Sequence, residues 1–247
     1  MKTMDENINR ERFYRDIANG AGLEKFQVRV EETDLLVMAE RNLKKEVEEE
    51  AIKQRTAIKN HIKGHPEFYT SFSPLKYESG GEIIRLMCDS SEMTLTGPMA
   101  SVAGAIAETA GKKLLAFTKQ VFIENGGDIF ALMHRDFTVG IYAGSSPLSL
   151  KIGLRVKGGD APSGIATSSG TVGHSFSYGN ADAVTVLSGS AAFADGAATY
   201  FGNIVTGKGI EYKLVEKELE KFPFIYGLTI IKGEELFAWG KIELVSL

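Results

Sequence analysis

The chain of 247 residues has few of the side chains that form disulfides and zinc clusters. It contains one cysteine, Cys88, and four histidines, so an intramolecular disulfide is excluded and no Cys/His cluster with zinc-ligand spacing occurs. Cys88 lies in the apolar run IIRLMCD, where we expect a buried and inert thiol. One thiol without a partner suits a reducing compartment, and we therefore expect a cytoplasmic protein.

Long apolar segments and a strong net charge are also missing. The longest candidate for a membrane segment, Gly97 to Ala110, is too short for a bilayer and contains Glu108, and the first residues lack the apolar centre of a signal peptide. The formal net charge of -4 creates no field that attracts nucleic acid or an anionic membrane. We expect no nucleic-acid and no membrane partner, so any phosphate must be held by local groups.

Several familiar site motifs do not occur in the sequence. There is no GxSxG elbow, no GxxxxGK[ST] phosphate loop and no GxGxxG that opens a helix. His61 and His65 follow a charged helical segment and His134 lies in the turn MHRD, so all three are expected at the surface.

The order of the predicted elements indicates an α+β fold, because strands and helices occur in runs and do not alternate strictly. We expect a single domain over residues 1–247, with residues 1–10 as a flexible tail. The carboxy-terminal strands offer an interface for a homodimer. The predicted helices cover 41–62, a segment after Gly97, and 188–203; the predicted strands lie within 25–39, 120–123, 129–133, 138–143, 148–156, 224–232 and 235–244.

The segment SGSAAFADGAATYFGN, from Ser188 to Asn203, combines a helix of small residues with one carboxylate and one hydroxyl. Asp195 and Thr199 are four positions apart, which places both side chains on one helical face. Such a face admits a flat ligand or another backbone, and its oxygens suit a cation such as Mg²⁺. The other interpretation is a packed core helix with a solvated Asp195 and with Thr199 bonded to its own turn.

The segment ENGGDIF places polar groups around two glycines between predicted strands. Asn125, Gly126, Gly127 and Asp128 form a turn in which the backbone can come close to a ligand. A hairpin turn without a ligand is the alternative interpretation.

A second polar segment runs from Gly164 to Asn180. Its hydroxyl and N–H groups, with the imidazole that follows, could surround phosphate or ribose, and a flexible surface loop is the alternative. His174 is the best candidate for acid/base catalysis because an imidazole titrates near neutral pH. The candidate ligand-binding residues here are Thr167, Ser168, Ser169 and Gly170.

An internal comparison suggests an ancient duplication. The segment TGPMASVAGAIA from Thr96 aligns with SGSAAFADGAAT from Ser188 and matches glycines and alanines at four positions. Two such helices could hold a ligand between their amino-terminal ends, where N–H groups favour phosphate. Chance explains the match equally well, because glycine and alanine are common.

Taken together, these segments resemble motifs of the ApbE superfamily, whose characterised members are Mg²⁺-dependent FAD:protein FMN transferases. ADGAAT resembles the metal motif ADALAT, NGGDI resembles the NxGGDI turn, and GPMASVAGAIA resembles the helix GGIAKGYAVD. ATSSG resembles the ATSG segment before the HIIDP motif. VEETDLLVMAERNL and HPEFYTSFSPL resemble an ApbE-like branch of anaerobic archaea and bacteria, so the likeness runs nearly the full length.

The resemblance implies antiparallel sheets flanked by helices and a nucleotide as the small-molecule partner. It also implies that Asp195, Thr199 and the carbonyl of Ala100 bind Mg²⁺, and that His174 holds the acid/base position. The turn 125–128 and the loop 168–170 would contact FAD.

Three departures from the family pattern predict a changed or lost reaction. Ser101 replaces the helix lysine, Ile106 aligns near the helix aspartate, and HIIDPRTG has become HSFSYGNA. The first hypothesis is an Mg²⁺-dependent enzyme that transfers FMN or cleaves the FAD pyrophosphate. The alternative is a flavin- or nucleotide-binding or assembly protein without catalysis in anaerobic metabolism, with sulfur metabolism as a context that the branch suggests.

Overall fold

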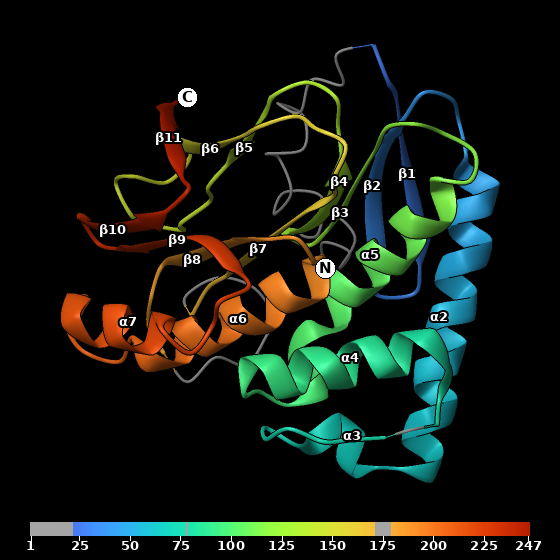
Figure 1. Ribbon diagram of the computed structural model, residues 1–247, viewed down its shortest axis with the longest axis horizontal. Helices are drawn as coiled ribbons and strands as arrows, with labels where there is room; N and C mark the ends of the chain where they lie inside the picture. The colour runs from blue at the N-terminus through green and yellow to red at the C-terminus, as the bar shows by residue number, and fades with distance from the viewer. Residues whose placement is uncertain (1–21, 78, 171–178) are drawn as a thin grey trace, which may run out of the picture.

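Two antiparallel sheets frame the computed structural model, which describes residues 22–77, 79–170 and 179–247 (Figure 1). The strands are β1 (Glu24–Val30), β2 (Thr33–Ala39), β3 (Val121–Asn125), β4 (Asp128–Leu132), β5 (Phe137–Gly140), β6 (Ile152–Val156), β7 (Ser163–Ser168), β8 (Ala183–Ser188), β9 (Ile225–Lys232), β10 (Glu235–Gly240) and β11 (Glu243–Ser246). The larger sheet has eight strands in the order β1-β2-β3-β4-β7-β8-β9-β10, and the smaller has three in the order β11-β6-β5. Every neighbouring pair is antiparallel, as expected for an α+β fold.

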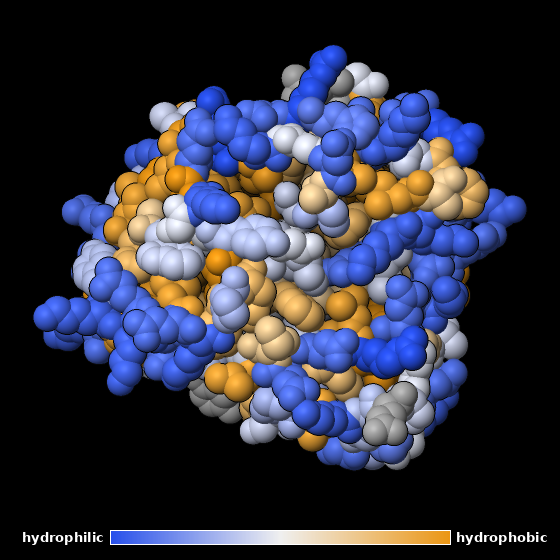
Figure 2. Space-filling model, viewed as in Figure 1, coloured by the Kyte–Doolittle hydropathy of each residue, from blue (hydrophilic) through white to orange (hydrophobic). Residues whose placement is uncertain are grey.

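The longer helices gather on one face of the larger sheet (Figure 1). The helices are α2 (Lys44–Gly64), α3 (Glu67–Thr70), α4 (Gly81–Thr94), α5 (Val102–Leu114), α6 (Ala191–Ile204) and α7 (Tyr212–Leu219), and the 3-10 turn η2 (Pro98–Ser101) precedes α5. Within the described ranges, no helix combines the length and the apolar character needed to cross a bilayer. The face seen in Figure 2 carries hydrophilic side chains around its periphery with hydrophobic residues between them.

Both faces of the larger sheet are buried because its strands alternate two sets of apolar side chains. Val37, Ile123 and Phe130 belong to the core shared with α2, α4 and α5. Their neighbours Met38 and Phe122 belong to a second core, which the smaller sheet covers. The molecule therefore has three layers, with the larger sheet between the helices and the smaller sheet.

Most of the predicted elements are confirmed. The helix predicted over 41–62 is α2, the small-residue helix over 188–203 is α6, and the two strands of 25–39 are β1 and β2. The predicted last strand is divided, because Gly240 adopts a φ of 83° and the chain then leaves β10 to join the smaller sheet as β11.

Two other expectations need separate mention. The interpretation of 164–180 as a surface loop is wrong for its first part, because residues up to Ser168 form β7 within the larger sheet. The helices that suggested an internal duplication, α5 and α6, pack against each other, and the duplication itself stays a prediction. Residues 1–10, predicted as a tail, lie outside the described residues.

Candidate functional site

A cavity of about 1800 Å³ lies between the two sheets, and most of the site residues predicted from the sequence line it. Side chains of β2, β3 and β4 form its floor, and β5 lines another wall. The predicted site residues that line it are Ala100, Asn125, Gly126, Gly127, Asp128, Thr167, Ser168, Ser169, Asp195 and Thr199. Gly170 does not line the cavity; its N–H donates to the Ala181 carbonyl at 2.9 Å.

The turn between β3 and β4 requires its two glycines. Asn125 pairs with Asp128 across the strands, so the loop consists of Gly126 and Gly127, which have φ values of 67° and 110°. Two successive residues with positive φ are typical of the tight hairpin turns in which glycine is preferred. The Asn125 side-chain amide donates to the Ala103 carbonyl at 3.0 Å, which fixes the turn against the start of α5. The turn therefore holds Asp128 in a defined position.

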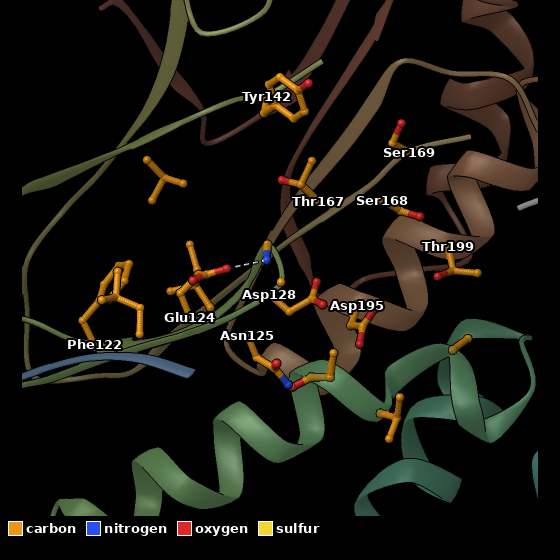
Figure 3. A pocket seen from close by; sticks show the side chains of 18 of the residues that line it. Phe122, Glu124, Asn125, Asp128, Tyr142, Thr167, Ser168, Ser169, Asp195 and Thr199 are labelled. Carbon is orange, nitrogen blue, oxygen red and sulfur yellow. Dashed lines mark hydrogen bonds between the residues drawn. The ribbon is translucent and has the colours of Figure 1, made fainter. Parts of the chain in front are cut away.

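Asp195 and Thr199 lie one turn apart on α6, and both line the cavity (Figure 3). The Asp195 Oδ2 accepts a hydrogen bond from the Gly104 N–H at 2.9 Å. This N–H belongs to the first turn of α5, where free donors and the helix dipole favour a negative charge. Asp195 is half-buried, and this N–H contact shows that its side chain also has a partner within the protein.

Asp128 and Asp195 point toward each other across the end of the cavity (Figure 3). Burial raises the pKa of Asp195 to about 7, although the N–H groups of Gly104 and Ala103 act in the opposite direction. Burial, followed by the charges of Asp195 and Glu124, raises the pKa of Asp128 well above its ordinary range. No basic side chain of the described residues forms an ion pair with Asp128 or Asp195. Their mutual repulsion is therefore not offset by a protein cation in that part of the chain.

The residues at this end of the cavity fit a hard divalent cation. Oxygens come from Asp195 and Thr199 on α6, from Asp128 on β4 and from Ala100 in η2. Carboxylate, hydroxyl and carbonyl oxygens are the ligands that Mg²⁺ and Ca²⁺ prefer. No group of three or more His, Cys, Asp or Glu side chains suited to a metal occurs within the described ranges. An ion here would therefore also need oxygens from Thr199, the backbone, water or the ligand.

Hydroxyl groups at the end of β7 line the cavity beside α6. Figure 3 shows Thr167, Ser168 and Ser169 along one segment, on the same side of the cavity as Thr199. The Thr167 Oγ1 lies 3.0 Å from the Thr185 Oγ1, so this hydroxyl is oriented by the neighbouring strand. These hydroxyl groups line the cavity, and their role in binding a ligand stays a prediction.

The amino-terminal end of α6 is already capped by the protein. The buried Glu108 Oε2 accepts from the Ser190 hydroxyl at 2.6 Å and from the Ala192 N–H at 3.2 Å, and the Ser190 Oγ accepts from the Phe193 N–H. A capped helix end has fewer free N–H groups for an anion. The expectation of a ligand held between two helix amino termini is therefore wrong for α6.

The small residues of α6 serve the packing of helices. A Cβ atom at Gly104 would lie 2.3 Å from the Ala191 carbonyl oxygen, and one at Gly196 would lie 2.6 Å from the Thr94 hydroxyl. Helices α4 and α5 thus pack against the small-residue face of α6, which the sequence predicted to admit either a flat ligand or another backbone. Only the side of α6 with Asp195 and Thr199 faces the cavity.

Several lining residues were not selected from the sequence. Phe122 and Glu124 alternate on β3, and Met38 on β2 and Tyr142 after β5 also line the cavity. The alternation in VFIEN places Phe122 and Glu124 on one face, but nothing local marks that face as the floor of a cavity.

The structure corrects one histidine assignment. His61 is buried against Phe68 and Tyr77 at the end of α2, where the expected position was the surface. The segment after α2 folds back over this ring, which a helical pattern alone does not reveal. Cys88 is buried as predicted, and burial raises its pKa. The predicted catalytic residue His174 lies outside the described residues.

The chain matches known families over most of its length. Residues 15–217 match the family model described as AbpE bacteria. A UPF0280 protein of Methanococcus aeolicus is 41% identical over 197 residues, which cover 77% of this chain and 79% of that protein. A UPF0280 protein of Methanocaldococcus jannaschii is 40% identical over 230 residues, which cover 90% of this chain and 93% of that protein.

Solved structures share the fold at much lower identity. The apo form of the flavinyl transferase ApbE of Pseudomonas stutzeri has a TM-score of 0.53 and 16% identity, and the match covers 88% of this chain and 93% of that chain. An ApbE protein of Thermotoga maritima has a TM-score of 0.56 and 13% identity, with coverage of 87% and 96%. The expected ApbE-like architecture of antiparallel sheets flanked by helices is thus confirmed.

Proposed function

The chain belongs to the ApbE-like family described as AbpE bacteria, and on this premise we propose that it binds a flavin nucleotide, such as FAD, together with Mg²⁺ in the cavity between its sheets. The observation that carries the proposal is the pair of carboxylates, Asp128 and Asp195, that face each other beside the Thr199 hydroxyl. The volume of the cavity is large enough for a dinucleotide.

The charge of the cavity supports a metal as part of the ligand. Glu124, Asp128 and Asp195 line it, whereas Arg135 is the one basic side chain among the described lining residues and is exposed. A dinucleotide carries a negatively charged diphosphate, which these carboxylates would repel. A divalent cation between carboxylates and diphosphate removes the repulsion, so the acidic wall and an anionic ligand become compatible.

Asp195, Thr199 and the carbonyl of Ala100 would hold the ion, with Asp128 beside them. The bound ion would neutralise charge on the diphosphate during its cleavage. The turn at Asn125 and the hydroxyl groups at the end of β7 would position the nucleotide around that point. In FMN transfer, an acceptor hydroxyl oxygen would form a bond to the FMN phosphorus while the bond to AMP breaks, and His174 is the predicted base for the hydroxyl proton.

A specific observation favours a second function, binding without catalysis. The positions that resemble the family's helix lysine and aspartate are Ser101 and Ile106, and both are buried. The Ser101 hydroxyl donates to the Pro98 carbonyl at 3.1 Å, and neither side chain lines the cavity. A protein with this site would keep the nucleotide and lack groups that act on it.

Incubation with FAD and Mg²⁺ separates the two functions. Release of AMP by the wild-type chain, and its loss in Asp195→Ala, would support the enzyme. Tight FAD binding without AMP would support the binding protein. No binding of FAD in the presence of Mg²⁺ would refute both, and Asp160→Asn, an exposed carboxylate that does not line the cavity, provides the control.

A further inference from the structure

Strand β10 forms an open border of the larger sheet. It pairs with β9 and has no strand on its other side in the described part of the chain, and Figure 1 shows it at the border of the molecule. Its sequence ELFAWG contains no lysine and no proline, with which proteins commonly protect such a border against pairing. Strand β1, at the opposite border, carries Lys25 and Arg29. The border at β10 therefore lacks the protection that β1 has.

The turn before β10 determines which of its backbone groups point outward. The loop between β9 and β10 consists of Gly233 and Glu234, and Gly233 has a φ of 58°. In a two-residue hairpin the flanking residues, here Lys232 and Glu235, exchange hydrogen bonds, and every second residue after them does the same. The odd-numbered residues of β10 therefore bond to β9.

The even-numbered residues of β10 direct their N–H and C=O groups away from β9. Lys241 continues the odd-numbered series, and its N–H donates to the Tyr226 carbonyl at 2.7 Å, in agreement with this alternation. Leu236 and Ala238 belong to the even-numbered series, and among the described residues neither forms a backbone hydrogen bond to a loop, a turn or a second strand. Ala238 is also exposed. Its backbone groups can therefore pair with a strand of another molecule.

We propose that β10 pairs with β10 of a second copy of this chain, antiparallel across a twofold axis at Ala238. In such a pair the residue on the axis faces its own copy, so its backbone groups must point outward. This register places Phe237 opposite Trp239 in a pair without hydrogen bonds, where side chains lie closest. The two aromatic residues thus meet twice, once on each side of the axis.

The charges at the two ends of the strand are complementary in this register. Glu235 of each copy lies opposite Lys241 of the other, and such a pair of opposite charges stabilises neighbouring strands. The Glu235 Oε2 accepts the Ile210 N–H at 2.9 Å, so the carboxylate is already held at this border. A register centred on Leu236 would instead place Glu235 opposite the buried Phe237. The charges therefore favour the axis at Ala238.

Exposed aromatic side chains beside the border would extend the contact. Trp239 is 40% exposed, and Tyr212 on α7 is 44% exposed with its ring centroid 5.7 Å from that of Phe237. Aromatic residues are enriched at protein interfaces, because they bury a large area with few rotatable bonds. None of the β10 residues lines the cavity, so this interface and the proposed ligand site are tested separately.

Light scattering after size-exclusion chromatography of the full chain tests the pairing. The wild-type chain should have twice the chain mass of 26.8 kDa and should dissociate on dilution. Ala238→Lys places two like charges opposite each other on the axis, so the dissociation constant of the dimer should rise about tenfold or more. Gln27→Lys, an exposed position of β1 at the opposite border, is the matched control and should dimerise like the wild type.

Hydrogen exchange provides a second readout that needs no variant. The amides of Leu236 and Ala238 should exchange slowly in the dimer and rapidly after dilution, because the second copy supplies their acceptors. A wild-type chain that is monomeric at every concentration, or rapid exchange of both amides at high concentration, would overturn the proposal. Urea denaturation verifies the fold of Ala238→Lys. A dimer that persists in the folded variant would overturn the proposal as well, because another surface would then join the copies.

Discussion

The metal-free protein should lose stability as the pH rises, because the half-buried Asp195 faces the buried Asp128. Burial raises the pKa of Asp195 from 3.8 to about 7. Between these values the unfolded chain has released a proton that the folded chain retains, so the free energy of unfolding falls with increasing pH. At 1.36 kcal/mol per pH unit, the free energy of unfolding at pH 8 is about 4 kcal/mol lower than at an acid pH where Asp195 is protonated in both states.

The substitution Asp195→Asn removes this dependence, since the amide carries no charge at any pH. In EDTA, urea denaturation of the wild-type chain should give a free energy of unfolding that is about 2.5 kcal/mol lower at pH 8 than at pH 5, because the remainder of the loss has already occurred between pH 3.8 and pH 5. The variant should show a smaller decrease, because the contribution of Asp195 is lost while the burial of Asp128 remains. In thermal unfolding this difference between pH 5 and pH 8 corresponds to a shift of the wild-type melting temperature by roughly 5–10 °C, at 2–4 °C per kcal/mol for a chain of this size.

Mg²⁺ provides the second arm of this experiment. At a concentration of 100 times its dissociation constant, the ion should raise the free energy of unfolding of the wild-type chain at pH 8 by about 2.7 kcal/mol. It should raise that of Asp195→Asn only slightly. Asp160→Asn should behave like the wild type, because this exposed side chain does not line the cavity. A wild-type stability that is equal at both pH values, or an equal decrease in Asp195→Asn, would refute the assignment of the buried pair.

Three further predictions concern the elements that position the site. Gly104→Ala should lower the free energy of unfolding in urea by about 2 kcal/mol, because the added Cβ would lie 2.3 Å from a carbonyl oxygen of α6. Gly159→Ala should leave this free energy unchanged, because no atom lies within 4 Å of the position of its Cβ. Gly126→Val should cost about 2 kcal/mol and Gly126→Asn less than half of that, because asparagine tolerates the φ of 67° better; equal costs would contradict the turn geometry. Glu108→Ala should cost about 2 kcal/mol, because it leaves the first turn of α6 without its acceptor, and a cost no greater than that of Glu92→Ala on the surface would refute this role.

The local elements of the site could be predicted from the sequence because short-range patterns determine them. Two adjacent glycines between apolar strands predicted the turn at Gly126, and the spacing of Asp195 and Thr199 predicted their common face on α6. Pro98 suits the first turn of a helix, so the sequence predicts a helix after Gly97; in the structure the turn η2 begins at Pro98 and α5 follows from Val102. Each of these features depends on residues within one turn or one hairpin.

The assembly of the site could not be predicted in this way, because it depends on contacts between distant segments. The approach of Asp128 to Asp195 follows from the packing of α6 against β4 and α5, and no local pattern predicts it. The burial of Glu124 requires the smaller sheet to cover β3. Serine, threonine and glycine favour turns, so the sequence around Gly164 is also compatible with a surface loop. In the structure Gly164 lies in β7 and lets α6 approach this strand closely, since its Cβ would lie 2.1 Å from the Ser190 carbonyl carbon.

The most direct test of the proposed site is a calorimetric titration of the chain with FAD, carried out once in EDTA and once in Mg²⁺. Binding to the wild-type chain should require Mg²⁺, and Asp195→Ala should weaken the Mg²⁺-dependent affinity by about tenfold or more, because it removes a ligand of the ion. Thr199→Val should weaken it in the same direction. FAD binding that is equally tight in EDTA and in Mg²⁺, and unchanged by Asp195→Ala, would contradict a metal-dependent nucleotide site between the two sheets.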